Sequence, residues 1–464
     1  MKSPAAARRR DRLVVLAIAA LVRALVIAWG ATKFPAAADG TYYNRIAERI
    51  ASGNGYTWVW PDGAVTFAAH YPIGYPALIA PFYALFGAHA FLAMMVNALF
   101  GVAASVAAYD LARASGWGKR AGFFAGIGVA IHPALVPYTL AIMTEGVTAS
   151  LIIIAAAFAA RSKIQLKTRW IIALGISLGV ATLVRPQSIL LAPFFGFLAS
   201  RGSILPRARV AIVTSAIAIA CCLPWTARNC VRMHRCALVS VNAGWNLLIG
   251  EESTSGAWQP IDVPDDCKTV WDEAAKDECF DQEARARILD RPGNFFAHMP
   301  QKISVTFDYF GGAPWYLHES NPDAFGDSAK STLGVVETIF SRLVLAGALL
   351  SFAVIYRRSR VSWIIALIGF PFSFLRAGYV ATLALALAIL LSKRARENVA
   401  LGAAAWTLAA TAITHAIFFG AGRYGLVSSP LIVVVCASCG MRAWRGKVRP
   451  SLATRSFKNS FSKS

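Results

Sequence analysis

The sequence predicts an all-α polytopic membrane protein, because long apolar runs recur along it and few charges interrupt them. Of its 464 residues, 57% are hydrophobic and 15% are charged. A helix needs about 20 mostly apolar residues to cross a bilayer. The runs are continuous rather than alternating, which is typical of membrane helices and not of membrane β-strands. We expect about 11–13 transmembrane helices.

Twelve apolar runs are candidate spans, although two of them, 170–184 and 187–200, are short for this purpose. The twelve lie at 13–30, 88–112, 120–138, 143–160, 170–184, 187–200, 208–226, 336–356, 361–375, 378–392, 398–419 and 424–441. We expect the first run to be retained as a helix, since no convincing small-residue cleavage site follows it.

Basic residues set the expected orientation, because cytoplasmic loops carry an excess of Lys and Arg. Clusters occur at every second crossing: Arg8/Arg9/Arg10/Arg12, Arg113/Lys119/Arg120, Arg161/Lys163/Lys167/Arg169, Arg201/Arg207/Arg209, Arg357/Arg358/Arg360, Lys393/Arg394/Arg396 and the tail from Arg442 to Lys463. We therefore expect both termini in the cytoplasm of a bacterium, with the protein in its inner membrane. The net charge of +22 reflects this topology, and we expect no nucleic-acid partner.

Two long loops are left to face outward, at 31–87 and 227–335. The second holds 16 of the 24 acidic residues. The chain then divides into an N-terminal transmembrane module (1–226) that contains the first outer loop, the acidic extracytoplasmic loop (227–335), a C-terminal transmembrane module (336–441) and a basic cytoplasmic tail (442–464). We expect the chemistry in the first module.

The first outer loop places a carboxylate just beyond the first span. Asp39 opens the run Asp-Gly-Thr-Tyr-Tyr, so Tyr42 and Tyr43 follow it closely. A carboxylate beside tyrosines at the end of a membrane helix is placed for polar chemistry. The alternative is that Asp39 only caps the helix expected over 42–52, since Asp is a favoured N-cap.

A second polar and aromatic run in this loop begins at His70 and Tyr71 and continues Pro-Ile-Gly-Tyr-Pro. The apolar stretch that follows, to Phe86, is too short to cross. We expect interfacial helices in this loop, lying at the outer surface; a buried re-entrant segment is the alternative.

Polar groups at the outer ends of other spans point toward the same face as Asp39. They are Glu145, Arg185, Arg228 and Arg423. Ionisable residues in membrane segments are costly and are usually functional, so we expect an outward cavity lined by carboxylates and guanidiniums. In the alternative interpretation, Glu145 and Arg185 form a structural ion pair and Arg228 is an interfacial anchor.

Four cysteines lie in the acidic loop: Cys230, Cys236, Cys267 and Cys279. Disulfides form in extracytoplasmic compartments, and four cysteines allow three pairings. We expect Cys267 to pair with Cys279 and Cys230 with Cys236. A zinc site is the alternative, but the spacings fit no usual zinc finger.

Together these motifs resemble those of the C-type (GT-C) glycosyltransferases, multispanning enzymes that take sugars from polyprenyl-phosphate carriers. The similarity is greatest to bacterial relatives of protein O-mannosyltransferase and of the lipid A aminoarabinose transferase. It extends from residue 13 to about residue 441. The motifs, in family order, are Asp39-Gly-Thr-Tyr-Tyr, Tyr71-Pro-Ile-Gly-Tyr-Pro, His132-Pro, Thr144-Glu145, Val184-Arg-Pro, Pro224-Trp…Arg228-Asn, Asn242…Gly250, Pro292-Gly and Arg423-Tyr.

The resemblance implies the GT-C fold and makes Asp39 the catalytic acidic residue and Glu145 the second acidic position. It also implies transfer, with inversion, from a polyprenyl-phosphate sugar to an envelope glycan, lipid or protein. Because polyprenyl phosphate leaves without a proton donor, one general base can suffice. The departing phosphate needs cations, and the candidates are Arg185, Arg228, Arg423 and His70.

The tyrosines near these groups, Tyr42, Tyr43, Tyr71 and Tyr424, are expected to line the substrate site. Some relatives carry a lysine that meets the donor phosphate where this chain has Tyr71, so phosphate binding must come from elsewhere. No cofactor is certain. Glu145 can orient an acceptor, a divalent metal or an arginine, and the sequence leaves these three open.

Two other classes of function remain to be weighed. A transporter or flippase for a polyprenyl-linked glycan would also line a cavity with Arg and Glu. Transporters often contain two similar halves, however, and no internal repeat is visible here. A noncatalytic subunit with the same fold is the other alternative, against which Asp39 argues. The sequence therefore favours a membrane glycosyltransferase.

The orientation predicts how introduced cysteines react. In intact cells, an impermeant thiol reagent should label a single cysteine introduced at position 265 and leave one at position 460 unlabelled, because only the former faces outward. The reverse pattern would invert the topology and remove the argument for an outward-facing site.

Overall fold

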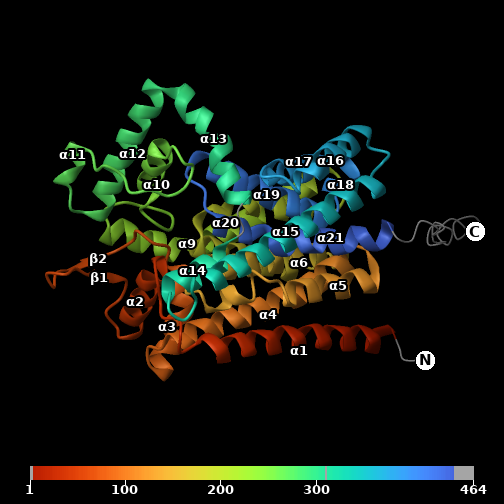
Figure 1. Ribbon diagram of the computed structural model, residues 1–464, viewed down its shortest axis with the longest axis horizontal. Coiled ribbons are helices and arrows are strands. Elements are labelled where there is room, and N and C mark those ends of the chain that lie inside the picture. The colour runs from red at the N-terminus through yellow and green to blue at the C-terminus, as the bar shows by residue number, and fades with distance from the viewer. Residues whose placement is uncertain (1–3, 309–310, 444–464) are drawn as a thin grey trace, which may run out of the picture.

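The computed structural model describes residues 4–308 and 311–443 as a bundle of helices with a smaller helical region at one end (Figure 1). Helices α2, α3, α10, α11 and α12 and the hairpin β1–β2 gather at that end. The start of α1 and the end of α21 lie at the opposite end. These elements of the two long loops therefore lie together and away from the start of α1 and the end of α21.

Six helices within the described residues are long and apolar enough to cross a membrane. They are α1 (Pro4–Gly30), α4 (Ala90–Ala114), α6 (Thr144–Gln165), α9 (Ile204–Arg232), α15 (Asp327–Ile355) and α19 (Val399–Ile417). Their length and hydropathy, with the scarcity of strands in the described part of the chain, confirm the all-α membrane fold class.

The other predicted spans coincide with shorter apolar helices. These are α5 (Gly118–Ala130), α7 (Thr168–Val184), η2 (Pro186–Leu191) with α8 (Ala192–Leu198), α16 (Arg360–Phe372), α17 (Gly378–Leu391), and α20 (Gly422–Gly425) with η3 (Leu426–Ser428) and α21 (Ser429–Ala443). Prolines explain part of this shortening, since a proline cannot continue the hydrogen bonds of the helix before it. At Pro186, for example, α7 has ended and η2 begins.

The bundle core is packed largely with alanine. On α6 and α19, Ala155, Ala156, Ala403 and Ala404 are fully buried in one cluster. Small side chains let membrane helices approach closely, which compensates for the weak hydrophobic driving force between helices in lipid.

The first outer loop folds into α2 (Asp39–Ala51), the antiparallel strands β1 (Thr57–Val59) and β2 (Val65–Phe67), and α3 (Gly74–Phe86). Helix α2 is amphipathic and buries Tyr43, Ile46 and Ala47. Each helix has a glycine in its first turn, Gly40 in α2 and Gly74 in α3, where neighbouring backbone packs closely. A Cβ on Gly40 would lie 2.8 Å from the carbonyl oxygen of Ile142, and one on Gly74 would lie 2.4 Å from the backbone of Leu183.

Helix η1 (Pro137–Leu140) precedes α6, and the short helix α14 (Gly312–Ser320) lies near the end of the acidic loop. Tyr316 of α14 reaches the first outer loop: its hydroxyl accepts N–H bonds from Ala37 and Ile142, at 3.3 and 3.1 Å. Helix α14 therefore ties the start of α2 to the start of α6.

The acidic loop contributes α10 (Ala243–Glu252), α11 (Asp265–Lys268), α12 (Glu273–Asp290) and α13 (Pro292–Phe307). Asp272 caps α12 by accepting the N–H of Ala275 at 2.8 Å. Asp277 joins α12 to α10 by accepting the N–H of Trp245 at 2.9 Å. The loop is thus a packed helical region. The predicted basic tail, 442–464, lies almost entirely outside the described residues.

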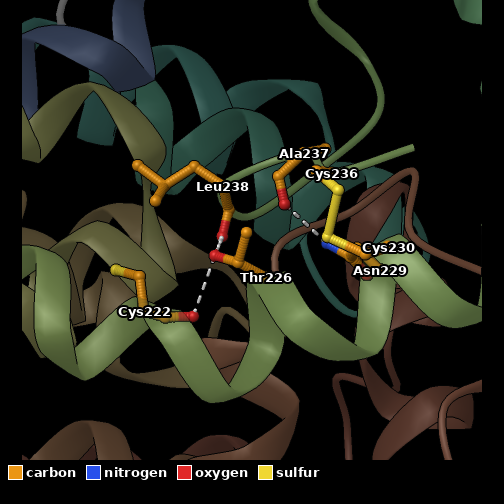
Figure 2. The surroundings of a disulfide bond; sticks show 7 residues. All are labelled: Cys222, Thr226, Asn229, Cys230, Cys236, Ala237 and Leu238. Carbon is orange, nitrogen blue, oxygen red and sulfur yellow. Dashed lines mark hydrogen bonds between the residues drawn. A yellow bond between two sulfur atoms is a disulfide. The ribbon is translucent and has the colours of Figure 1, made fainter.

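Both expected cysteine pairs appear as disulfides, Cys267–Cys279 and Cys230–Cys236. Figure 2 shows the latter at the end of α9, where the chain turns back along the helix. Thr226 donates to the carbonyl of Leu238 at 3.0 Å, and Asn229 donates to that of Ala237 at 3.1 Å. The disulfide and these bonds fix the entry into the acidic loop.

The Cys267–Cys279 pairing predicts a specific loss of stability. Closing a loop of about a dozen residues is worth about 3 kcal/mol in the chain-entropy model. The double Cys→Ser variant at 267 and 279 should therefore unfold at a lower temperature, and protease should cut the acidic loop first. Mass spectrometry of unreduced peptides checks the pairing directly; four free thiols would contradict it.

Candidate functional site

The candidate site centres on Asp39, the first residue of α2. The N-cap position is occupied by Ala38, and no side chain caps the helix. The Asp39 carboxylate instead accepts from the Tyr71 hydroxyl at 2.9 Å and forms an ion pair with Arg423 Nη2 at 2.7 Å. Asp39 thus has polar partners from distant parts of the chain, and the interpretation that it only caps a helix is wrong.

The backbone just before Asp39 is strained. Ala38 has φ +49°, in a region that residues with a Cβ rarely adopt. Such conformations persist only when surrounding contacts impose them, and they cluster at functional sites. Here the hydrogen bond from Ala37 to Tyr316 and the close packing of Gly40 supply those contacts.

Glu145 forms the second carboxylate of the site, in the first turn of α6. Its side chain is 2% exposed, and its Oε1 pairs with Arg185 Nη1 at 2.8 Å and lies 3.5 Å from Arg423 Nε. The Tyr138 hydroxyl donates to Oε2 at 2.7 Å. A buried carboxylate is tolerated when it is paired and hydrogen-bonded in this way.

Arg423 lies between the two carboxylates and bridges them. It comes from α20, whereas Arg185 follows α7 in an extended conformation that the next residue, Pro186, favours. Both guanidiniums also pack on the ring of Tyr424, at 4.7 Å for Arg185 and 5.3 Å for Arg423. Cations over an aromatic face are stabilised by its quadrupole.

Each arginine keeps one nitrogen without a hydrogen-bond partner in the structure, although the atom is buried. These are Nε of Arg185 and Nη1 of Arg423. A buried unsatisfied donor is costly, so the cluster has donor capacity for an anion.

A small pocket adjoins this cluster. It is lined by Arg185 and Tyr424 together with Ser188, His415, Thr411, Thr148, Gln187 and Thr407 and the apolar side chains of Ile152, Leu191, Ala410 and Val427. The pocket has a cationic, hydrogen-bonding wall and an apolar wall, and its volume of about 20 Å³ is room for about one water molecule.

The remaining predicted site residues lie around the cluster or apart from it. Tyr43 contacts Tyr71 edge to face at 5.2 Å, and Tyr42 stacks on Trp58 at 4.4 Å. Arg228 lies apart: its amino groups donate to the backbone carbonyls of Ala68 and Tyr56 at 2.9 and 2.8 Å. Through these hydrogen bonds Arg228 holds the backbone of the first outer loop.

His70 faces the acidic loop. Its ring contacts Tyr71 at 4.9 Å and Trp245 at 5.6 Å. Burial lowers the pKa of His70 to about 4, although the nearby Asp39 acts in the opposite direction. The imidazole is therefore neutral near pH 7, so it can offer an anion a hydrogen bond but no charge.

Sequence reasoning missed Tyr138, Trp315 and His415, and it named Thr144 only as part of a motif. The Thr144 hydroxyl lies 3.3 Å from Arg185 Nη1, the Trp315 ring lies 5.2 Å from the Arg423 guanidinium, and His415 stacks on Tyr424 at 4.4 Å. His415 carried a signal, since an ionisable residue in an apolar helix is a functional candidate. Among the described residues, no group of three or more His, Cys, Asp or Glu side chains could hold a metal ion.

Known proteins share parts of this sequence and its fold. Residues 70–227 match the sequence model of the dolichyl-phosphate-mannose-protein mannosyltransferase family. This match, over less than half of the chain, includes the second run of the first outer loop, Glu145 and Arg185. No curated protein matches the chain.

The structure resembles the apo oligosaccharyltransferase of Archaeoglobus fulgidus, with a TM-score of 0.50 and 18% identity over 92% of this chain. The chain has the GT-C fold. It spans 50% of the archaeal protein. ArnT from Cupriavidus metallidurans matches in its apo state and bound to undecaprenyl phosphate, each with a TM-score of 0.40 and 14% identity, over 93% of this chain and 77% of ArnT. The resemblance to GT-C glycosyltransferases that the motifs indicated is confirmed.

The burial of Glu145 predicts that the cluster contributes to stability. In Glu145→Gln, two buried guanidiniums would share a neutral amide, and breaking a buried ion pair costs about 3–5 kcal/mol. The variant should melt well below the wild type in a thermal unfolding assay in detergent. Glu319→Gln, at an exposed position on α14, is the matched control; equal melting of all three proteins would contradict the ion network.

Proposed function

We propose that the chain is a membrane glycosyltransferase that moves a sugar from a polyprenyl-phosphate donor to an acceptor hydroxyl at the outer face. The observation that carries this proposal is the pair of carboxylates bridged by Arg423, with unpartnered guanidinium nitrogens beside them. The match of residues 70–227 to a family that uses a lipid-phosphate sugar supports the same chemistry. The lipid bound in the ArnT complex, undecaprenyl phosphate, belongs to the same chemical class as the proposed leaving group.

The donor phosphate is proposed to bind beside Arg185, where the small pocket would have to widen to admit it. Arg185 would contribute its unpartnered nitrogen and Ser188 its hydroxyl, and Arg423, which lies outside the pocket lining, would contribute positive charge. Forked guanidiniums suit phosphate oxygens better than a lysine does. This arrangement supplies the anion site that the tyrosine at position 71, in place of a lysine, leaves open.

In the proposed reaction, Asp39 removes the proton of the acceptor hydroxyl while the acceptor oxygen attacks the anomeric carbon. The bond from that carbon to the phosphate oxygen breaks, and polyprenyl phosphate leaves with the electron pair. A single displacement of this kind inverts the configuration at the anomeric carbon. We assign the role of general base to Asp39 because its side chain is 30% exposed. The side chain of Glu145 is 2% exposed, and its oxygens are bonded to Arg185, Arg423 and Tyr138.

The charge balance of the cluster favours this assignment. Two carboxylates and two guanidiniums sum to zero before the reaction. When Asp39 takes a proton, the cluster gains a net positive charge while negative charge grows on the departing phosphate. Preorganised charges that match the change in the transition state are an effective source of catalysis. Glu145 is left to orient the two arginines.

Asp39→Asn tests this function. Asparagine keeps one of the two acceptor oxygens, which serve Tyr71 and Arg423 separately in the wild type, but it cannot take a proton. Removing a general base typically slows transfer about 10²–10⁴-fold. In the host organism, a deletion strain should accumulate a polyprenyl-phosphate sugar in lipid extracts. Wild-type protein should clear it, and the variant should not, at equal membrane levels. Clearance by the variant would exclude Asp39 as the base.

A further inference from the structure

A single carboxylate of the acidic loop holds the backbone of the first outer loop. Glu273 lies in the first turn of α12, and its Oε2 accepts two backbone N–H bonds, from Ala69 at 2.6 Å and His70 at 3.1 Å. These partners lie more than 200 residues away in sequence. Hydrogen bonds from backbone N–H to a carboxylate are charge-assisted and stronger than neutral ones.

The neighbouring backbone groups are held by other long-range bonds. The carbonyl of Ala68 accepts from Arg228 at 2.9 Å, and that of Ala69 accepts from the N–H of Val241 at 2.9 Å. The carbonyl of Tyr71 accepts from the Tyr56 hydroxyl at 2.6 Å. The segment 68–71 is therefore fixed along its length, and Glu273 supplies the acceptor for the N–H groups of Ala69 and His70.

The side chain at the end of this segment reaches the site. Tyr71 donates its hydroxyl to Asp39 Oδ1 at 2.9 Å, and its ring packs against Tyr42 and Tyr43 at 4.5 and 5.2 Å. A hydrogen bond of this kind depends on backbone placement, because it weakens steeply with distance and angle.

We infer that Glu273 is a positioning residue, which holds the backbone of Ala69 and His70 so that Tyr71 keeps its hydrogen bond to Asp39. The acidic loop thereby holds in place the hydrogen bond that Asp39 accepts. The relevance of this hydrogen bond to catalysis rests on the proposed function of Asp39. The dependence of the bond on Glu273 is a property of the folded protein.

Other groups also face Asp39, and they must stay constant in a test. They are Arg423 from α20, His70, Tyr43 on α2 and Tyr316 on α14, with Glu145 acting through Arg423. Glu273 bonds to none of their side chains in the structure. A change at Glu273 that alters Asp39 should therefore act through the 68–71 backbone.

The test follows the carboxylate stretching bands of Asp39 in the purified full-length protein by infrared difference spectroscopy, with Asp39→Asn as the subtracted reference. A hydroxyl that donates to a carboxylate oxygen shifts these bands, so Tyr71→Phe, which removes the donor, should displace them. Glu273→Ala should displace them in the same direction and to a similar extent. The double variant should show no further shift, since both changes remove the same contact.

Two further variants separate positioning from charge and from folding. Glu273→Gln keeps an oxygen where Oε2 lies and should give the carboxylate bands of the wild type, whereas an electrostatic effect would make it resemble Glu273→Ala. If the alanine variant fails to fold, Glu273→Asp, which withdraws the carboxylate by one methylene, should give a smaller shift in the same direction. Glu278→Ala, at an exposed position on α12, is the matched control.

The inference is overturned if Glu273→Ala lowers the melting temperature but leaves the carboxylate bands of Asp39 unchanged, or if the shifts of the two single variants add. It is also overturned if Tyr71→Phe itself produces no shift. Because this measurement needs no substrate, its result is independent of the lipid-accumulation test, in which clearance by Asp39→Asn would instead remove the general base.

Discussion

The burial of Glu145 is the constraint on which the rest of the site depends. A carboxylate that is 2% exposed must be paired and hydrogen-bonded, and its partners come from η1, from the residue after α7, and from α20. Those elements must meet at the start of α6 for the charge to be tolerated. When these elements meet, Arg423 comes within reach of Asp39. The ion pair of Asp39 therefore follows from the pairing of Glu145.

The sequence predicted the helices and the identity of the charged residues better than it predicted their partners. Apolar runs locate helices because a bilayer demands them, and Asp39, Glu145, Arg185 and Arg423 stand out because charges at such positions are rare. Arg228 looks equivalent in sequence, yet its amino groups bind backbone carbonyls. The choice among arginines depends on tertiary contacts, which neither periodicity nor spacing contains.

The aromatic residues show a second limit of sequence reasoning. Tyr71 was expected to line the substrate site, but the structure also gives its hydroxyl a defined acceptor on Asp39. Tyr138 and Trp315 carried no local signal, because a tyrosine or tryptophan near a membrane surface is expected at any interface. Their roles become visible only when η1 and α14 are placed against α6 and α20. The charged cluster is thus enclosed by rings from four separate parts of the chain.

The contact between Arg423 and Asp39 joins residues 384 positions apart, and this separation bears on how the protein is made. The chain enters the membrane from its N-terminus, so Asp39 and Glu145 are inserted long before their shared arginine is synthesised. Until α20 arrives, Glu145 depends on Arg185 for its ionic partner, and Asp39 has none in the bundle. The pairing of Asp39 therefore waits for the last helices: a truncated chain keeps its early helices and the pair of Glu145 with Arg185, but it leaves Asp39 without an ionic partner.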